Sequence, residues 1–227
     1  MSPRDFSYLL ERTNRETLEI AVLPNGRVQV KAPTSASDEE VERRVLRRKP
    51  WIMRQLAFFQ DFEPRPSPRH YAAGETHLYL GKRYRLRLLA GESSVNIEDG
   101  YLVVRTRDTS PAVVAKVVEG WQRKCAKNIF PTVVDKAWAR FEYRIDRKPK
   151  LCVKTLTRRW GSLSPNGILT LNLALIQAPL PCIEYVACHE LCHIEHQDHG
   201  PKFYAKLEQV LPSWKDQKKR LERSIQF

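Results

Sequence analysis

The stretch CHELCHIEHQDHG, from Cys188 to Gly200, holds four of the six histidines of the chain and decides how its fold is interpreted. Residues 182–194 contain neither Gly nor Pro. Apolar side chains recur there at helical spacing, at Ile183, Ala187, Leu191 and Ile194. The pattern predicts a helix whose buried stripe lies roughly opposite His189 and His193, so that the two histidines do not face the core.

The two histidines of HELCH have the spacing of a metal site. His189 and His193 stand one helical turn apart, so their imidazoles can converge on one ion. Glu190 is about 100° around the helix from His189, where it can reach a water at the metal rather than the metal itself. This HExxH pattern predicts a catalytic zinc site with Glu190 as the general base. The alternative is a surface helix that carries its histidines by chance.

A third zinc ligand has to come from outside the HExxH turn, because catalytic zinc usually takes three protein groups and leaves a fourth position open. In a continued helix, His196 would lie about 10 Å from His189 along the axis, too far to share one ion. Residues 198–201, DHGP, favour a chain reversal that returns His199 to the metal. The sequence therefore predicts His189, His193 and His199 as the zinc ligands.

Other polar residues are candidates for further roles. Glu208, on the next expected helix, is the rival third ligand. His196 is expected beside the ligands or facing the substrate. A developing oxyanion needs a donor besides the metal, and the sequence leaves His196, Arg159 and Tyr204 open for it. Trp160 is expected to pack in the core rather than to wall the cleft.

Composition limits the class of protein. The 227 residues, 42% hydrophobic and 29% charged, suffice for one large domain or two small ones. No apolar run approaches a membrane span, and no secretory signal is visible, so we expect a cytoplasmic protein without a membrane partner. The five cysteines form no CxxC pair and are expected to be reduced, mostly as core residues. A net charge of +13 favours an anionic partner, most often nucleic acid, or else a generally basic surface.

Residues 1–109 predict an N-terminal lobe of β-hairpins around one helix. Ser37 caps the helix, expected over residues 38–59, which Pro50 should kink or split. Residues 63–69, EPRPSPR, predict a proline-rich connector. Three hairpins are expected: over residues 16–32 with a Pro24-Asn25-Gly26 turn, over 77–89, and over 94–106 with a turn at Asp99-Gly100.

Residues 110–227 predict a more helical lobe. Ser110-Pro111 begins one helix, and a second is expected to begin at Pro131. Residues 150–156 and 167–175 predict strands on either side of a loop, and the second strand could offer an edge to an extended peptide. Three helices are expected to begin near Pro181, after Gly200-Pro201 and after Ser213. The predicted fold class is α+β: a β-hairpin-rich N-terminal lobe and a C-terminal lobe with a small sheet and the HExxH helix.

Residues 157–212 resemble the YgjP-like metallopeptidase family, which is related to the SprT-like and WLM zincins. The motif residues of that family match His189, Glu190, His193 and His199, and its Trp-Gly-Ser motif matches residues 160–162. A cysteine is common after that serine, whereas this chain has Leu163. The resemblance extends more weakly to the N-terminal part. It implies a zincin-like lobe and a metal-dependent hydrolase. Nucleoside-triphosphate pyrophosphatase activity has also been attributed within the family, so the resemblance leaves the substrate open.

Three functions compete. We expect a zinc metallopeptidase that acts on a peptide or protein. The first alternative is a nucleoside-triphosphate pyrophosphatase in which Arg158 and Arg159 grip the phosphates, but the chain has no glycine-rich phosphate loop and no carboxylate set typical of Mg²⁺ sites. The second is a basic nucleic-acid-associated module with structural zinc, whereas closed structural sites favour four Cys or His ligands.

Overall fold

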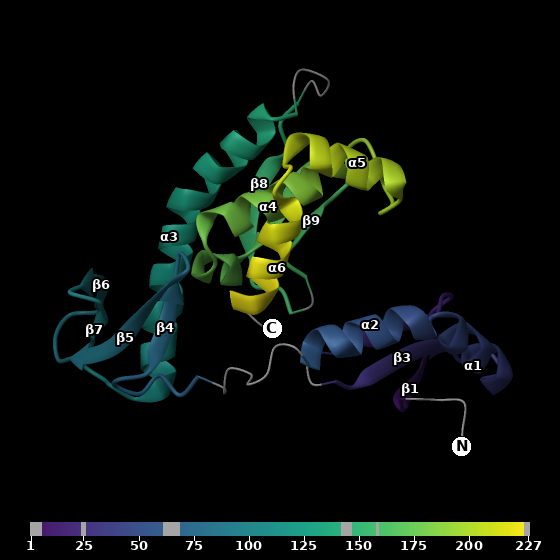
Figure 1. The fold of residues 1–227 in the computed structure, drawn as a ribbon. Helices are drawn as coiled ribbons and strands as arrows, with labels where there is room; N and C mark the ends of the chain where they lie inside the picture. Colours follow the sequence, from purple (N-terminus) through teal and green to yellow (C-terminus); the bar gives the residue numbers. More distant parts are fainter. Residues whose placement is uncertain (1–5, 24–25, 61–68, 142–146, 158, 225–227) are drawn as a thin grey trace. The chain divides into compact units, whose positions relative to one another are not determined.

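Strands and helices alternate along the chain in a computed structural model that describes residues 6–23, 26–60, 69–141, 147–157 and 159–224. Three small sheets and their covering helices give an α+β fold (Figure 1). The chain divides into two units, Met1–Pro66 and Ser67–Ile225. No helix in these described segments is long and apolar enough to cross a membrane.

The first unit is a three-stranded sheet packed against two helices. Its strand order is β1 (Tyr8–Thr13), β3 (Val28–Pro33), β2 (Glu19–Val22), with β1 parallel and β2 antiparallel to β3. Every second residue of β3 is buried, as a strand with one covered face requires. These residues meet the apolar sides of α1 (Asp38–Arg47) and α2 (Lys49–Gln60). The shared core consists of Val28, Val30, Ala32, Val41, Val45 and Ile52.

Most predictions for this unit are confirmed. β2 and β3 form the expected hairpin, although Pro24 and Asn25 of its turn lie outside the described residues. The Ser37 side chain accepts a hydrogen bond from the Glu40 N–H at 3.2 Å, the expected N-cap. The helix is split just before Pro50. β1 was not predicted, and the connector lies outside the described residues except for its last one.

The second unit begins with a four-stranded sheet. Its order is β4 (Thr76–Tyr79), β5 (Lys82–Leu89), β7 (Tyr101–Arg105), β6 (Ser94–Glu98). The β4–β5 and β6–β7 pairs are the predicted antiparallel hairpins, and β5 runs parallel to β7. Asp99 and Gly100 have φ angles of 47° and 81°, which a tight hairpin turn requires of both central residues.

One long helix, α3 (Pro111–Ala139), replaces the two that were predicted from Pro111 and Pro131. Pro131 removes the N–H that would bond to the Lys127 carbonyl, which normally breaks a helix. Here both residues lie on the exposed face, where water can satisfy that carbonyl. Phe130 and Val134 are buried on either side of the proline and hold the helix against the core. The prediction of a second helix was therefore wrong.

The two halves of α3 pack against different partners. Val114 and Val118 share a core with Leu86, Val95, Leu102 and Val104 of the four-stranded sheet. Further along, α3 packs against the helix that carries the histidine motif (Figure 1). The sheet of residues 76–105 therefore belongs with the C-terminal elements. The division near residue 66 differs from the expected lobes, 1–109 and 110–227, because the hairpins and α3 share one core.

The third sheet lies beside the histidine helix. Its order is β8 (Lys150–Lys154), β10 (Ile168–Asn172), β9 (Gly161–Leu163), with β10 parallel to β8 and antiparallel to β9. The prediction that β10 could offer an edge is wrong, because both its sides are paired. β9, inside the predicted loop, is an edge strand. A short 3-10 helix η1 (Leu173–Gln177) and the three predicted helices follow: α4 (Leu180–Cys192), α5 (Pro201–Val210) and α6 (Trp214–Ser224).

Glu184 joins α4 to α3. Its side chain is 9% exposed, and its carboxylate lies 2.8 Å from Arg140 Nε and 3.2 Å from Lys136 Nζ. Arg140 also donates to the Val210 carbonyl at 3.3 Å, so one guanidinium links α3 to both α4 and α5. The buried carboxylate of Glu184 therefore ties α4 to the C-terminal end of α3.

Replacing Glu184 with Gln should lower the free energy of unfolding by about 1–3 kcal/mol, because charge-assisted hydrogen bonds to a buried group are lost. Urea unfolding followed by circular dichroism measures it. Glu119→Gln, which removes an exposed pair with Arg123 on α3, is the matched control and should cost less than about 0.5 kcal/mol. Equal costs for the two variants would contradict the proposed role of Glu184.

Candidate metal centre

The ends of α4 and α5 bring the motif histidines together. Pro181 lies in the first turn of α4, where a missing N–H costs nothing. The helix ends at Cys192, and His193 is its C-cap. The chain then turns and enters α5 at Pro201, with Gly200 as the N-cap. The predicted helix stop after the HExxH turn and the chain reversal are both confirmed.

α4 is buried on nearly all sides, more than the amphipathic pattern predicted. The predicted apolar stripe is buried at Ile183, Ala187 and Leu191. Glu190, Cys188 and Cys192, on other faces, are buried as well. The expectation that the histidines face away from the core was too simple, because α3, β9, α5 and α6 all contact α4. His189 and His193 are half-buried.

The cysteines of α4 pack in the core, as predicted. Cys182, Cys188 and Cys192 are fully buried, and none of the five cysteines forms a disulfide. Burial is the main reason that the pKa of Cys188 and of Cys192 is raised to about 12. A buried thiol that stays protonated is inert, so these side chains serve packing.

The three histidines that were predicted as ligands lie together. His189 Nε2 and His199 Nε2 are 3.0 Å apart, and one ring nitrogen of each histidine, His193 included, lies within 4.8 Å of the others. Phe203 of α5 packs against all three rings, with centroid distances of 4.7 to 5.0 Å. Ligand atoms at about 2.0–2.1 Å from a tetrahedral zinc are about 3.3 Å apart. The group is therefore of a size that fits one ion.

The chemistry of these rings also fits a metal. Burial, followed by the neighbouring His199 and His193, lowers the pKa of His189 to about 3. Burial and His193 also lower the pKa of His199. Neutral imidazole is the form that binds a metal. His189 Nδ1 is buried without a hydrogen-bond partner in the described part of the chain, which leaves Nε2 as the interacting atom of that ring.

A backbone contact orients the third ring. His193 Nδ1 lies 3.0 Å from the carbonyl oxygen of His196. A carbonyl can only accept, so Nδ1 carries the proton and Nε2 keeps its lone pair. Such a contact is the usual way to set the orientation of a metal-binding imidazole. His196 thus contributes its main chain here, and its ring does not line the cleft described below.

Glu208, the rival third ligand, lies outside the histidine group. Its carboxylate accepts a hydrogen bond from Trp214 Nε1 and lies 3.4 Å from Lys215 Nζ. These contacts join α5 to α6 and account for its position.

Glu190 is held against the edge strand β9. Its carboxylate accepts a hydrogen bond from the Leu163 N–H. A Cβ atom added to Gly161 would lie 2.9 Å from both Cγ and Oε1 of Glu190. Burial raises the pKa of Glu190 to about 7, while Arg159 and the Leu163 N–H act in the opposite direction. The carboxylate is thus confined by a strand that the sequence did not predict.

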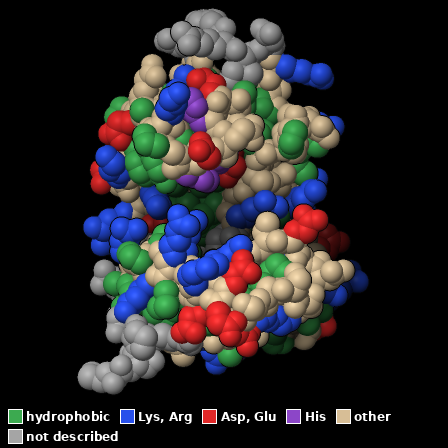
Figure 2. Space-filling view, turned by 90° about the vertical axis from the view of Figure 1, so that its right-hand side faces the viewer, with side chains coloured by type: hydrophobic (Ala, Val, Ile, Leu, Met, Phe, Trp, Pro, Cys, Tyr) green, Lys and Arg blue, Asp and Glu red, His purple; other side chains and the backbone are tan. Residues whose placement is uncertain are grey.

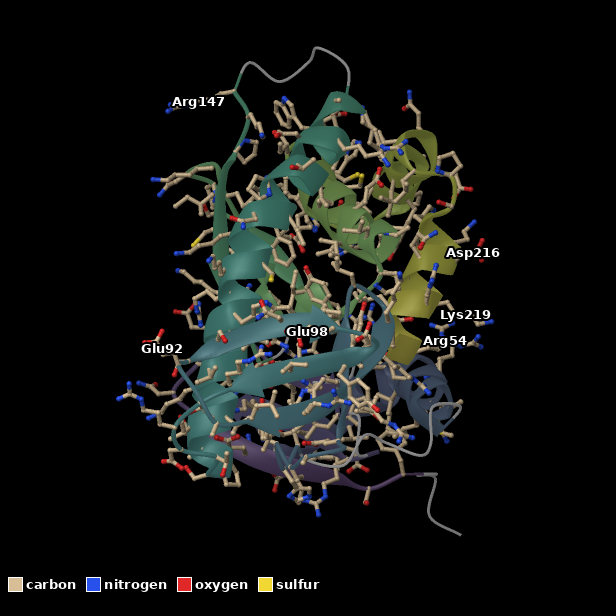
Figure 3. The ribbon with its side chains drawn as sticks, turned by 90° about the vertical axis from the view of Figure 1, so that its left-hand side faces the viewer. Arg54, Glu92, Glu98, Arg147, Asp216 and Lys219 are labelled. Carbon is tan, nitrogen blue, oxygen red and sulfur yellow. The ribbon has the colours of Figure 1, made fainter. Side chains whose placement is uncertain are left out.

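A cleft of about 650 Å³ contains the motif. Its described lining includes His189, Glu190, His193, Gln197 and His199 on the helix side and Gly161, Ser162, Leu163, Ser164 and Pro165 on the β9 side. In Figure 2 histidine side chains, in purple, reach the surface. Arg147 and Arg159 also line the cleft. Figure 3 labels Arg147, which lies at the opposite end of the second unit from Glu92 and Glu98.

Of the three candidate oxyanion donors, Arg159 lines the cleft, and His196 and Tyr204 do not. Trp160 packs against the core, as predicted. Arg158, expected to grip phosphates in the alternative function, lies outside the described residues.

Comparison with known families decides what kind of protein carries this cleft. The family described as "YgjP-like, metallopeptidase domain" matches residues 16–224. The chain belongs to this YgjP-like family. The match confirms the resemblance seen in the motifs and extends it over most of the first unit. Family membership and the three-histidine group support a metal-dependent peptidase.

Two solved structures resemble part of this YgjP-like protein. The metallopeptidase zymogen of Pyrococcus abyssi abylysin is 22% identical to this chain. The match covers 41% of this chain and 91% of the abylysin chain, with a TM-score of 0.37. The metallopeptidase zymogen of Methanocaldococcus jannaschii jannalysin is 21% identical to this chain. The match covers 41% of this chain and 85% of the jannalysin chain, with a TM-score of 0.35. A search of curated proteins gave no significant match.

Several residues of the cleft in this YgjP-like protein were not predicted from the sequence. Arg147 and Gln197 line it without belonging to any motif. The role of β9 was missed as well, because three residues with a glycine carry no strand pattern. The one available signal was the Trp-Gly-Ser motif, whose glycine and serine are the first two residues of β9.

Proposed function

We propose that this chain is a zinc-dependent peptidase in which His189, His193 and His199 hold the metal and Glu190 is the general base. The observation that carries the proposal is the convergence of three imidazoles beside a buried carboxylate in one cleft. Three ligands leave a position open for water or substrate, as in catalytic rather than structural zinc sites.

In this proposal the chemistry is divided between the ion and Glu190. When bound, Zn²⁺ supplies a Lewis acid and lowers the pKa of water toward neutrality. Glu190 accepts the proton of the attacking water and later donates it to the leaving amine. The Leu163 N–H and the close approach to Gly161 hold the carboxylate in one place, which supports this role.

We place the substrate along β9. Backbone bonds join Asn172 to Trp160 and Ser164 to Ile168. Because bonded pairs alternate along an antiparallel ladder, Gly161 and Leu163 turn their backbone groups away from β10. Because the Leu163 N–H already donates to Glu190, an extended peptide could pair with the other backbone groups of that edge and pass Glu190.

Arg159 is our choice as the group that stabilises the developing oxyanion, because it lines the cleft and interacts with Glu190. Arg147 adds a second positive charge to the same cleft. Together they favour substrates with acidic side chains or a free carboxylate near the cleaved bond.

The proposal is tested by incubating the protein with unfolded casein, with quenched fluorescent peptides and with nucleoside triphosphates. We expect peptide cleavage that a chelator abolishes and added zinc restores. Cleavage unaffected by the chelator would overturn the metal mechanism. Pyrophosphate release without peptide cleavage would favour the pyrophosphatase, although Glu190 is the one carboxylate among the described residues of the cleft.

Gly161→Ala tests the support of Glu190. The added methyl group would meet Glu190 and lie 3.1 Å from the Thr170 carbonyl oxygen, so the carboxylate must move. We expect zinc to be retained and kcat for a peptide to fall at least about tenfold, since small displacements of a catalytic group are costly. Gly120→Ala on α3, where a Cβ meets nothing within 4 Å, is the control and should keep full activity. A Gly161→Ala variant with unchanged kcat would contradict this support.

A further inference from the structure

The first unit carries a hollow lined by arginines. It measures about 1110 Å³ and lies beside β2, the end of α1 and the start of α2. Three partly buried apolar side chains line it, Leu18, Ile20 and Trp51, each also packed against the core of this unit. The other lining residues are Arg43, Arg44, Arg47 and Arg48. An aromatic ring and four guanidinium groups therefore share one open concavity.

The positive charge of this hollow is local. Residues 1–66 carry twelve Lys and Arg against ten Asp and Glu, so the unit as a whole is nearly neutral. Five of the twelve basic residues fall within residues 43–49. The hollow is therefore a concentrated patch and not a sample of a generally basic surface.

Helix stability does not explain all of these arginines. Arg43 with Arg47, and Arg44 with Arg48, are like charges four residues apart, and each such pair opposes the helix by about 0.2–0.5 kcal/mol. Glu40 pairs with Arg44 at 2.6 Å, and the dipole of α1 favours Arg47 near its end. Arg43 and Arg48 have no ion-pair partner in the described part of the chain. Arg48 is the C-cap of α1, whose dipole favours a cation, but it also directly precedes α2, whose dipole disfavours one.

The chemistry of the hollow matches a flexible polyanion with aromatic groups. Guanidinium groups bind phosphate oxygens in pairs. Residues four apart on a helix are about 6 Å apart along its axis, so Arg43 and Arg47 can contact separate phosphates of one strand. Grooves that combine positive charge with an aromatic platform are typical of single-strand binding, because any base can stack on the ring.

We propose that this hollow binds single-stranded nucleic acid, with phosphates on Arg43, Arg47 and Arg48 and a base against Trp51. All residues of this site belong to the first unit, and the proposal does not rest on the proposed peptidase chemistry.

The test uses the full chain and fluorescein-labelled oligo-dT and oligo-U of about 20 nucleotides, measured by fluorescence anisotropy at several salt concentrations. We expect the triple variant Arg43→Ala/Arg47→Ala/Arg48→Ala to bind at least about tenfold more weakly. The slope of log K against the logarithm of the salt concentration should become shallower by about two, at roughly 0.7 for each phosphate that is no longer neutralised. Trp51→Leu should weaken binding and leave the salt slope unchanged. Trp51→Phe keeps an aromatic ring, so its affinity should lie between those of the unchanged protein and Trp51→Leu. This comparison separates loss of stacking from damage to the core.

The matched control removes the same charge from β5 of the second unit, as Lys82→Ala/Arg83→Ala/Arg85→Ala. It should bind like the unchanged protein. Equal weakening by both triple variants would reduce the effect to net charge and overturn the proposal. Three other results would also overturn the proposal. The first is no oligonucleotide binding even at low salt, and the second is heparin binding as tight as oligonucleotide binding together with no effect of Trp51→Leu. The third is binding to phosphatidylserine vesicles without binding to oligonucleotides. Chelator-sensitive cleavage of a short peptide should be the same in both triple variants, so the outcome does not depend on the peptidase proposal.

Discussion

Glu190→Gln should bind zinc as the unchanged protein does and lose at least about 100-fold in peptide turnover, the low end for general-base catalysis. The carboxylate does not belong to the histidine group, so its amide analogue leaves the three ring nitrogens in place. Gln keeps the size and accepts the Leu163 hydrogen bond through its oxygen, but it cannot take the proton of water. Folding is expected to be preserved.

Metal content and kinetics have to be measured on the same preparation of this variant. Retained turnover would remove Glu190 as the base and leave the metal a structural role. Loss of zinc would instead make Glu190 a ligand. Glu195→Gln, which removes an ion pair with Lys206 beyond the motif, is a control that should change neither quantity.

His199→Ala should weaken zinc binding at least about 100-fold, more than the 10–100-fold typical of changes to groups that only orient a ligand. His199 supplies one of three nitrogens and comes from the connection between α4 and α5, so its loss leaves only the two histidines of the HELCH turn. Peptide turnover should fall with the metal. Equilibrium competition with a chromogenic zinc chelator measures the affinity.

Two controls separate His199 from its rivals. Glu208→Ala should retain zinc, because that carboxylate is engaged by Trp214 and Lys215. His196→Ala should also retain it, because its contact with His193 is made by the main chain. If Glu208→Ala loses zinc while His199→Ala keeps it, the ligand set proposed here is wrong.

The candidate site could be predicted because its geometry is local. His189 and His193 are four residues apart on a helix, and DHGP follows within one short connection, so helical angles and turn signals place all three rings. The hairpins at 77–89 and 94–106 were predictable for the same reason, since alternation and an Asp-Gly turn are short-range signals.

The features that were not predicted from the sequence depend on contacts between residues far apart in the chain. Pro131 is tolerated inside α3 partly because Phe130 and Val134 are buried against elements that follow much later in the chain. Gly161 and Leu163, which confine Glu190, are 29 and 27 positions before it, and no periodicity connects them to it. Burial of α4 on nearly all sides likewise follows from α3, α5 and α6 packing around it.

X-ray absorption spectroscopy of the zinc-loaded protein tests the metal site most directly. We expect about one zinc per chain, with nitrogen or oxygen neighbours at about 2.0–2.1 Å and the outer-shell scattering of three imidazoles. His199→Ala, loaded with excess zinc, should show one imidazole fewer. A sulfur neighbour at about 2.3 Å, or an imidazole count that His199→Ala leaves unchanged, would contradict a site built from His189, His193 and His199.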